Sequence, residues 1–221
     1  MDDLIADFHI HSKNSHDSLL SPECIVKRAK KVGLTCIAIT DHGTIRGGVE
    51  GKKIARKYGV EVIVGAEIKT DCGDIIGLNL NEEIEVTNWQ EVIRAIRVQG
   101  GTVVLPHPYR DYYPVEEIAK CVDFIEIWNS RCNPDENTKA ELLAGISEKK
   151  IIYGSDAHCL SEIGLVKVQL QLNPYTIKNV ISSLYTHQWT IQTSQLISYV
   201  KKHEYRQLMQ HGARFLWKKI T

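Results

Sequence analysis

The sequence lacks long apolar runs, closely paired cysteines and an excess of either charge. No apolar run approaches the roughly 18 residues that a membrane span needs, and two aspartates follow Met1 where a signal peptide would carry basic residues. None of the six cysteines forms a C-x-x-C pair, so neither a zinc knuckle nor a thioredoxin motif is expected. Because 27 basic residues balance 27 acidic ones, no overall field attracts nucleic acid or a membrane. We expect no membrane span, no signal peptide and a reducing cytoplasm as the setting.

The 221 residues suffice for one α/β domain of ordinary size or a small barrel. Short β-branched segments alternate with amphipathic ones, without a linker, a low-complexity segment or a strong repeat. The alternation predicts strands over 4–10, 35–40, 60–68, 73–80, 102–108, 123–128, 151–158 (strand plus loop) and 167–172. It predicts helices over 21–33, 45–58, 87–100, 115–121, 135–150 and 176–187. Repeated strand–helix units indicate parallel strands with helices outside, in either an open sheet or a barrel.

Local signals set several of these limits. Ser21 is a favourable N-cap, Pro22 suits the first helical position, and Gly33 is expected to end that helix. Thr87 is expected to cap the helix that ends at Gly100. The segment 73–80 is expected to pair with 60–68 as a hairpin.

The C-terminal segment differs from the rest in its charge. Residues 195–221 contain six Lys and Arg against one Glu, which predicts a basic amphipathic helix with a kink near Gly212. This helix either packs on the exterior of the domain or docks a protein partner, a nucleic-acid end or an anionic membrane. We therefore divide the chain into a domain over residues 1–190 and a helical extension over 191–221.

Residues that can bind metal ions recur just after the apolar strands. They are His9, His11, Asp41, His42, Glu67, His107, Asn129, Asp156 and His158. In parallel α/β folds the carboxyl ends of the strands face one side, so these residues are expected to meet in one cleft. His9 and His11 are two apart on a strand and share a face. Imidazole and carboxylate groups suit zinc or manganese, so the pattern predicts a metal site.

Five short motifs, in this order, resemble the PHP (polymerase and histidinol phosphatase) family. They are DFHIHS, ITDHG, GAEI, PHP and GSDAH, and the similarity covers about residues 5–190. The resemblance implies an α/β fold, a distorted (β/α)7 barrel, with a metal cleft at the carboxyl ends of the strands. It also implies two or three divalent ions (Zn, Mn or Fe) and hydrolysis of phosphoesters.

The resemblance also implies roles for single residues. His9, His11, Glu67 and Asp156 match the first metal site, and Glu67 would bridge to a second ion held by His107. His42 and His158 match ligands of a third ion. The family pattern allows either His16 or Asp17 as their companion, and Asp17 is favoured.

The second ion is where the sequence departs from the family pattern. Members with three ions usually supply another His, sometimes Cys, from a loop near the end of the strand 123–128. This chain offers Asn129 and Cys132 there, and Asn is a weak ligand. The second site is therefore expected to be loose or exchangeable.

The predicted reaction is attack on phosphorus by a water that bridges two ions, which lower its pKa. His158 or His42 would protonate the leaving oxygen if it is not a ligand, and Asp41 would orient the His42 ring. Three basic residues are expected to bind the substrate phosphate: Arg110, Arg131 and Lys13.

The expected activity is a metal-dependent phosphoesterase. Its substrate would be a phosphomonoester or phosphodiester of a small metabolite, a nucleotide or a short oligonucleotide. Two alternatives stay open: a non-catalytic accessory module that docks a partner through the basic tail, and an amidohydrolase acting on C–N bonds.

Overall fold

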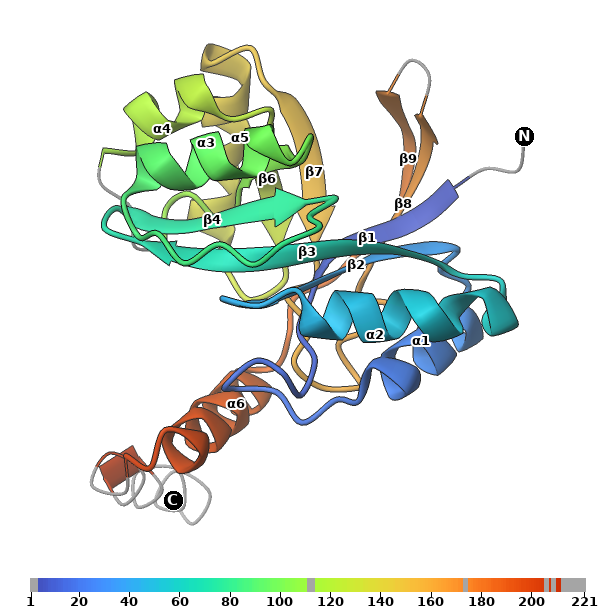
Figure 1. Cartoon of the computed structure of the whole chain (residues 1–221). Coiled ribbons are helices and arrows are strands. Elements are labelled where there is room, and N and C mark those ends of the chain that lie inside the picture. Colours follow the sequence, from blue (N-terminus) through green and yellow to red (C-terminus); the bar gives the residue numbers. More distant parts are fainter. Residues whose placement is uncertain (1–3, 111–113, 173–174, 205–206, 208–209, 212–221) are drawn as a thin grey trace.

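The computed structural model describes residues 4–110, 114–172, 175–204, 207 and 210–211. Within this part the strands form one sheet of nine in the order β7-β6-β5-β4-β3-β2-β1-β8-β9, which curls into a half-barrel (Figure 1). The strands are β1 (Leu4–Ile10), β2 (Cys36–His42), β3 (Glu61–Thr70), β4 (Gly73–Leu78), β5 (Thr102–Leu105), β6 (Phe124–Asn129), β7 (Lys150–Gly154), β8 (Val166–Leu172) and β9 (Tyr175–Ser183). The strands β1 to β3 are parallel to one another, as are β5 to β7, whereas β4 is antiparallel to both of its neighbours.

Helices cover the outside of the curled sheet and one of its ends. They are α1 (Pro22–Lys31), α2 (Arg46–Ala55) with the 3-10 turn η1 (Arg56–Tyr58), α3 (Trp89–Val98), α4 (Val115–Cys121), α5 (Pro134–Ile146) and α6 (Gln188–Lys201). The first two helices flank one arm of the sheet, and α3 to α5 flank the other (Figure 1). The interior is filled by buried side chains from strands around the curl, among them Phe8, Ala38, Ile76, Val104 and Ile152.

The two arms of the sheet meet at one end. Beyond β7 the chain bridges β1, where Ala157 accepts a hydrogen bond from His11 N at 2.8 Å and donates one to His9 O at 3.3 Å. Asp7 Oδ1 accepts a further bond from Ser155 N at 2.9 Å. The α/β class and the barrel-like curvature agree with the prediction. The sheet departs from a seven-stranded barrel because β8 and β9 extend it beyond β1.

Most predicted elements lie within a few residues of the observed ones, and two local expectations were wrong. Ser21 caps α1 as predicted, accepting from Cys24 N. The N-cap of α3 is Asn88 and not Thr87, because the Asn88 side chain accepts from Gln90 N and Glu91 N. The predicted helix over 176–187 is instead β9 and the segment after it. Thr176, Ile177, Val180 and Ile181 are β-branched and favour a strand, which β8 completes by antiparallel pairing.

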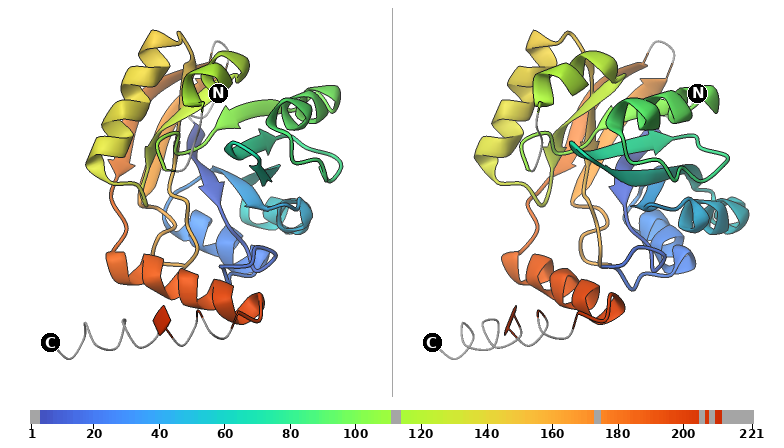
Figure 2. Two further views of the ribbon diagram at one scale, coloured as in Figure 1. Left: turned by 90° about the vertical axis from the view of Figure 1, so that its left-hand side faces the viewer. Right: turned by 60° about the vertical axis from the view of Figure 1, so that its left-hand side comes forward.

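The C-terminal segment does not extend away from the domain. The helix α6 starts at Gln188, before the predicted start at 195, and crosses the end of the sheet (Figure 2). Gly212, the predicted kink, lies outside the described residues. The division at residue 190 remains a prediction. No helix in the described part is both long and apolar enough to span a membrane.

Candidate metal centre

Two histidines at the end of β1 form the middle of the site. His9 and His11 are buried, and their Nε2 atoms lie 3.0 Å apart. Glu67 Oε2 lies 3.4 Å from His9 Nε2 and 3.2 Å from His11 Nε2. Asp156 Oδ1 lies 3.6 and 3.2 Å from the same two atoms. The four side chains predicted to hold the first ion therefore converge on one point.

The charges around these histidines oppose the effect of burial on their pKa values. Burial alone would lower the pKa of His11, but the carboxylates of Asp156 and Glu67 beside it raise that pKa to about 9. The pKa of His9 is likewise raised, since Asp156, Glu126 and Glu67 outweigh its burial. The site therefore attracts positive charge to its rings, and a divalent cation would replace protons at the same place.

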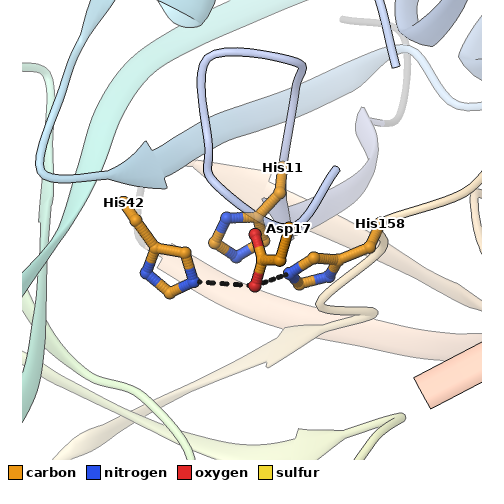
Figure 3. Close-up of side chains that lie close together, drawn as sticks. All are labelled: His11, Asp17, His42 and His158. Carbon is orange, nitrogen blue, oxygen red and sulfur yellow. Dashed lines mark ion pairs between the residues drawn. The ribbon is translucent and has the colours of Figure 1, made fainter. Parts of the chain in front are cut away.

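A second cluster joins His11, Asp17, His42 and His158 (Figure 3). Asp17 Oδ2 lies 3.3 Å from His42 Nε2 and 2.9 Å from His158 Nε2. Burial would raise the pKa of Asp17, yet the two histidines hold it well below its usual range. Asp17 Oδ1 is buried without a hydrogen-bond partner in the described part of the chain. An acidic group surrounded by three rings and with one oxygen unpaired fits a cation ligand.

His16 lies on the outer side of this cluster. Its ring stacks on the His42 ring at 4.6 Å, and its Nδ1 lies 3.1 Å from Ser198 Oγ of α6. Burial is the main reason that the pKa of His16 falls to about 4. The geometry thus brings Asp17, and not His16, toward the other predicted ligands, although the ligand role itself remains a prediction.

Glu67 connects the middle of the site to His107. While Oε2 faces His9, His11 and His42, Oε1 lies 2.8 Å from His107 Nε2. This arrangement has the geometry expected of a bridging carboxylate. His107 and Asp156 both have positive φ values, 29° and 54°. Such backbone strain in non-glycine residues is concentrated at functional sites.

A carboxylate that the sequence analysis missed orients two of the histidines. Glu126 on β6 is buried, with Oε1 3.0 Å from His9 Nδ1. Its Oε2 accepts from His107 N at 2.9 Å and from Asn129 Nδ2 at 3.0 Å. A hydrogen bond at Nδ1 leaves Nε2 of the His9 ring for a cation. The available signal was a single acidic residue within the apolar segment FIEIW.

Neither candidate for the missing ligand of the second ion is placed to bind one. The Oδ1 of Asn129 accepts from Arg110 Nη2 at 3.0 Å and from Arg131 N at 2.9 Å. Cys132 is outside every ligand group found among the described residues. Burial raises the pKa of the Cys132 thiol to about 12, and only partial compensation comes from Arg110 at 3.6 Å. These two residues support the surrounding loops instead.

Asp41 does not orient the His42 ring as predicted. Its carboxylate accepts from Ser12 N at 2.5 Å, Ser12 Oγ at 2.7 Å and Ser15 Oγ at 3.1 Å. Ser15 Oγ in turn accepts from His42 N at 2.9 Å and lies 3.0 Å from His11 Nδ1. The fully buried Asp41 therefore acts on the site through the loop that carries Asp17.

A cavity of about 290 Å³ opens beside Asp17. Its lining residues are His16, Asp17, Arg110, Arg131 and, from α6, Ile191, Ser194, Gln195, Ser198 and Tyr199. Arg110 Nη1 lies 3.0 Å from Asp156 Oδ2, whereas Arg131 is held by Glu162 Oε1 at 3.1 Å and Ser194 Oγ at 3.0 Å. Two of the three predicted phosphate-binding residues therefore reach this cavity.

Lys13, the third, is exposed and is not among the lining residues. Its carbonyl oxygen accepts from Lys201 Nζ at 2.8 Å, as do those of Ser15 and Ser18 at 2.7 Å each. Lys201 thereby joins α6 to the loop that carries Asp17.

The chain is similar in sequence and in fold to several known proteins. The sequence model of the PHP domain family matches residues 7–214. An uncharacterized protein of Methanocaldococcus jannaschii is 50% identical over 115 residues, which are 47% of this chain and 67% of that protein. A 5′-3′ exoribonuclease of Haemophilus influenzae is 40% identical over 80 residues, which are 34% of this chain and 29% of that protein.

Among solved structures, a two-domain protein from Bacteroides vulgatus that contains a predicted PHP-like metal-dependent phosphoesterase has the same fold. Its TM-score is 0.66 at 22% identity, over 76% of this chain and 59% of that one. The family match spans all five motifs and nearly the whole length. The chain therefore belongs to the PHP domain family.

Proposed function

We propose that the chain hydrolyses the ester bond of a small phosphorylated molecule, with bound divalent cations at the carboxyl end of the sheet. The observation that carries this proposal is the cavity beside Asp17, because Arg110 and Arg131 both line it. Its volume of about 290 Å³ lies at the lower end of ligand pockets. Such a space suits a phosphorylated metabolite or a nucleotide better than the interior of a polymer.

The ligand residues are assigned to holding two or three cations, for which zinc, manganese and iron all suit the donor set. They are His9, His11, Asp17, His42, Glu67, His107, Asp156 and His158. When bound, the cations would lower the pKa of a water molecule and neutralise charge on the phosphoryl oxygens. Proton transfer to the leaving oxygen by His42 or His158 remains a prediction. Both rings face Asp17, and a ring that binds a cation there would not supply the proton.

The chain itself would bind and orient the phosphate. Guanidinium groups present paired donors that match phosphate oxygens, and Arg110 reaches the cavity next to Asp156. Glu162 and Ser194 hold Arg131 in the wall, so its position does not depend on substrate. On the far side, α6 limits how much of the substrate can extend away from its phosphate.

A substrate screen tests this proposal. The purified chain, supplied with Mn²⁺, is offered sugar phosphates, nucleotides, histidinol phosphate, a chromogenic phosphodiester and N-acyl compounds. We expect turnover of small phosphoesters that a chelator abolishes, and loss of that turnover in His9→Ala and Asp156→Ala. A cation-loaded chain that turns over none of the phosphoesters would contradict the proposal, and turnover of N-acyl compounds alone would favour an amidohydrolase.

A short oligonucleotide end is the second candidate substrate. The match to the exoribonuclease of Haemophilus influenzae favours it, although it covers only 29% of that protein. A 5′-labelled RNA and the matching mononucleotide, assayed side by side, separate the two. Preference for the RNA would support the second candidate and contradict a cavity limited by α6.

Partner docking through residues 195–221 remains a prediction. The start of that segment lies in α6, where Lys201 bonds three carbonyl oxygens of the domain. Those contacts favour a role in the site for this part of the segment over a role as a free docking helix.

A further inference from the structure

The three elements α1, α2 and η1 carry a large excess of positive charge. Together they contain nine Lys and Arg against two Glu, which gives them a net charge of +7 in a chain whose total is zero. Seven of these cations are exposed, and we call them the basic face: Lys27, Lys30, Lys31, Lys52, Lys53, Arg56 and Lys57. Such a concentration produces a local positive potential, although the chain as a whole is neutral.

The basic face extends from α2 to the end of α1. Both helices pack on the same arm of the sheet and share one apolar cluster beneath them (Figure 1). The Nζ atoms of Lys27 on α1 and of Lys57 on η1 lie 5.9 and 5.8 Å from the centre of the Tyr58 ring. Between α2 and the segment after β4, Lys53 and Arg56 line a cavity of about 470 Å³. The cations therefore follow one path over the outside of the fold.

Few of these cations are neutralised within the protein. In the described part of the chain, Lys27 pairs with Glu23 at 2.9 Å, and none of the other six cations of the basic face forms an ion pair. Cations four residues apart on a helix, such as Lys52 and Arg56, repel one another. A bound chain of negative charges would remove this repulsion, so the basic face has the electrostatics of a surface that binds a polyanion.

The surroundings of the basic face favour nucleic acid over a protein or a membrane. No large apolar side chain of α1, α2 or η1 is exposed. Protein interfaces bury an apolar core, and helices that lie on membranes need an apolar face, so neither partner finds its usual contacts here. The ring of Tyr58, half-buried and close to two lysines, instead offers a surface on which a base can stack. Cations around an aromatic ring are typical of surfaces that bind single strands.

We propose that the basic face binds a single-stranded nucleic acid, with its cations on the phosphodiester backbone and Tyr58 against a base. The face lies on the outside of the sheet, whereas the candidate metal centre lies at the carboxyl end of the strands (Figure 1). The inference therefore goes beyond the proposed function and does not depend on what the metal centre hydrolyses.

The test is binding of a fluorescent oligouridylate without a terminal phosphate, measured by anisotropy on the full chain. A chelator is present, so the probe is not hydrolysed through the metal centre. We expect binding that weakens as salt rises from about 50 to about 200 mM. Lys53→Gln with Arg56→Gln should weaken it about tenfold and reduce the slope of log affinity against log salt by about 1.4, since two phosphate contacts are lost. Lys30→Gln with Lys57→Gln, on the α1 side of the face, should have the same effect.

Arg94→Gln with Lys139→Gln is the matched control. It removes the same charge from exposed positions on α3 and α5, outside the basic face. We expect this variant to bind the probe as tightly as the wild type does. An equal loss in all three double variants would show a general effect of net charge and overturn the assignment. Binding that neither pair of the basic face weakens would lie elsewhere on the chain, with the same consequence.

Tyr58→Leu separates stacking from charge. It removes the ring and leaves every cation, so it should weaken binding about tenfold with the salt slope unchanged. Unchanged affinity in this variant would overturn the choice of a single strand.

Competing polyanions identify the partner. Duplex DNA of the same length, polyglutamate and phosphatidylserine vesicles are offered against the bound probe, beside unlabelled oligouridylate. We expect the unlabelled oligouridylate to displace the probe at the lowest concentration. Displacement by one of the others at a lower concentration would indicate a different partner and overturn the proposal, as would a wild-type chain that does not bind the probe.

Discussion

Gly154, the last residue of β7, lies against the His9 side chain and against Glu126, which orients the His9 ring. A Cβ at this position would overlap Glu126 Oε1 and the Cβ of His9. Both neighbours are buried and lie on paired strands, so neither can move away freely. The substitution Gly154→Ala therefore forces His9 and Glu126 apart, although it adds only one methyl group.

The size of the expected loss in stability follows from the contacts that must change. The His9–Glu126 hydrogen bond, 3.0 Å long, involves a charged partner and contributes about 1.5–3 kcal/mol. Overpacking a methyl group into a filled site costs about 1–3 kcal/mol more. We expect Gly154→Ala to lower the free energy of unfolding by about 3–5 kcal/mol. It should also weaken Mn²⁺ binding at the site of His9, His11 and Glu67 at least tenfold.

Gly145→Ala provides the matched control. Gly145 is exposed near the end of α5, and a Cβ there would meet nothing within 4 Å. Alanine at this position should stabilise the chain by about 0.5 kcal/mol, because it lowers the entropy of the unfolded state. Urea unfolding of the metal-free chain and Mn²⁺ titration measure both variants. If Gly154→Ala matches the wild type in both, the packing argument is wrong.

Three further predictions concern the supports of the site and the pH dependence of stability. Asp41→Ala removes the acceptor of three buried donors in Ser12 and Ser15. We expect the free energy of unfolding, measured in urea, to fall by about 3 kcal/mol and the Mn²⁺ site at Asp17 to be lost. Full Mn²⁺ stoichiometry would refute this. Lys201→Met, compared with the exposed Lys202→Met, should speed protease cleavage of α6, because only Lys201 bonds the loop carbonyls; equal rates would contradict that role. Burial raises the pKa of the Cys36 thiol from 9.0 to about 12, so the folded state keeps its proton longer than the unfolded one and stability falls as pH rises from 9 toward 12. At pH 10.5 the free energy of unfolding is lower by about 2 kcal/mol. In urea titrations at several pH values, Cys36→Ala should lack this fall in stability. An equal fall in the variant would show that Cys36 is not its source.

The sequence was most informative where a parallel strand ends. His9, Glu67, His107 and Asp156 converge because parallel strands deliver their last residues to one side, and that rule needs no knowledge of packing. The same rule could not bring Asp74 into the group that it forms with Glu67 and His107, since Asp74 lies at the start of an antiparallel strand. The antiparallel hairpin of β3 and β4 was itself expected from the sequence and is confirmed, but ligands were sought only where strands end.

Other features depend on contacts between segments far apart in the chain. Glu126 was visible as one acidic residue in an apolar strand, but its partner His9 is 117 residues away. The strand β9 was mistaken for a helix because the spacing of its apolar residues suits both, and pairing with β8 decides between them. The position of α6 could not be predicted either, since its contacts with the loop after β1 span more than 180 residues.

The loops around the centre share one method of support, in which a buried carboxylate binds backbone N–H groups next to a predicted ligand. Asp41 holds Ser12 N, Glu126 holds His107 N, and Glu162 holds His158 N at 2.6 Å and Cys159 N at 3.0 Å. Burying such charges is unfavourable unless their hydrogen bonds are complete, so each loop has one low-energy position. These supports do not involve the ligand atoms that would face a cation. The ligand positions are therefore fixed by the fold before a cation binds, and changing a support should alter cation affinity through geometry without removing any ligand.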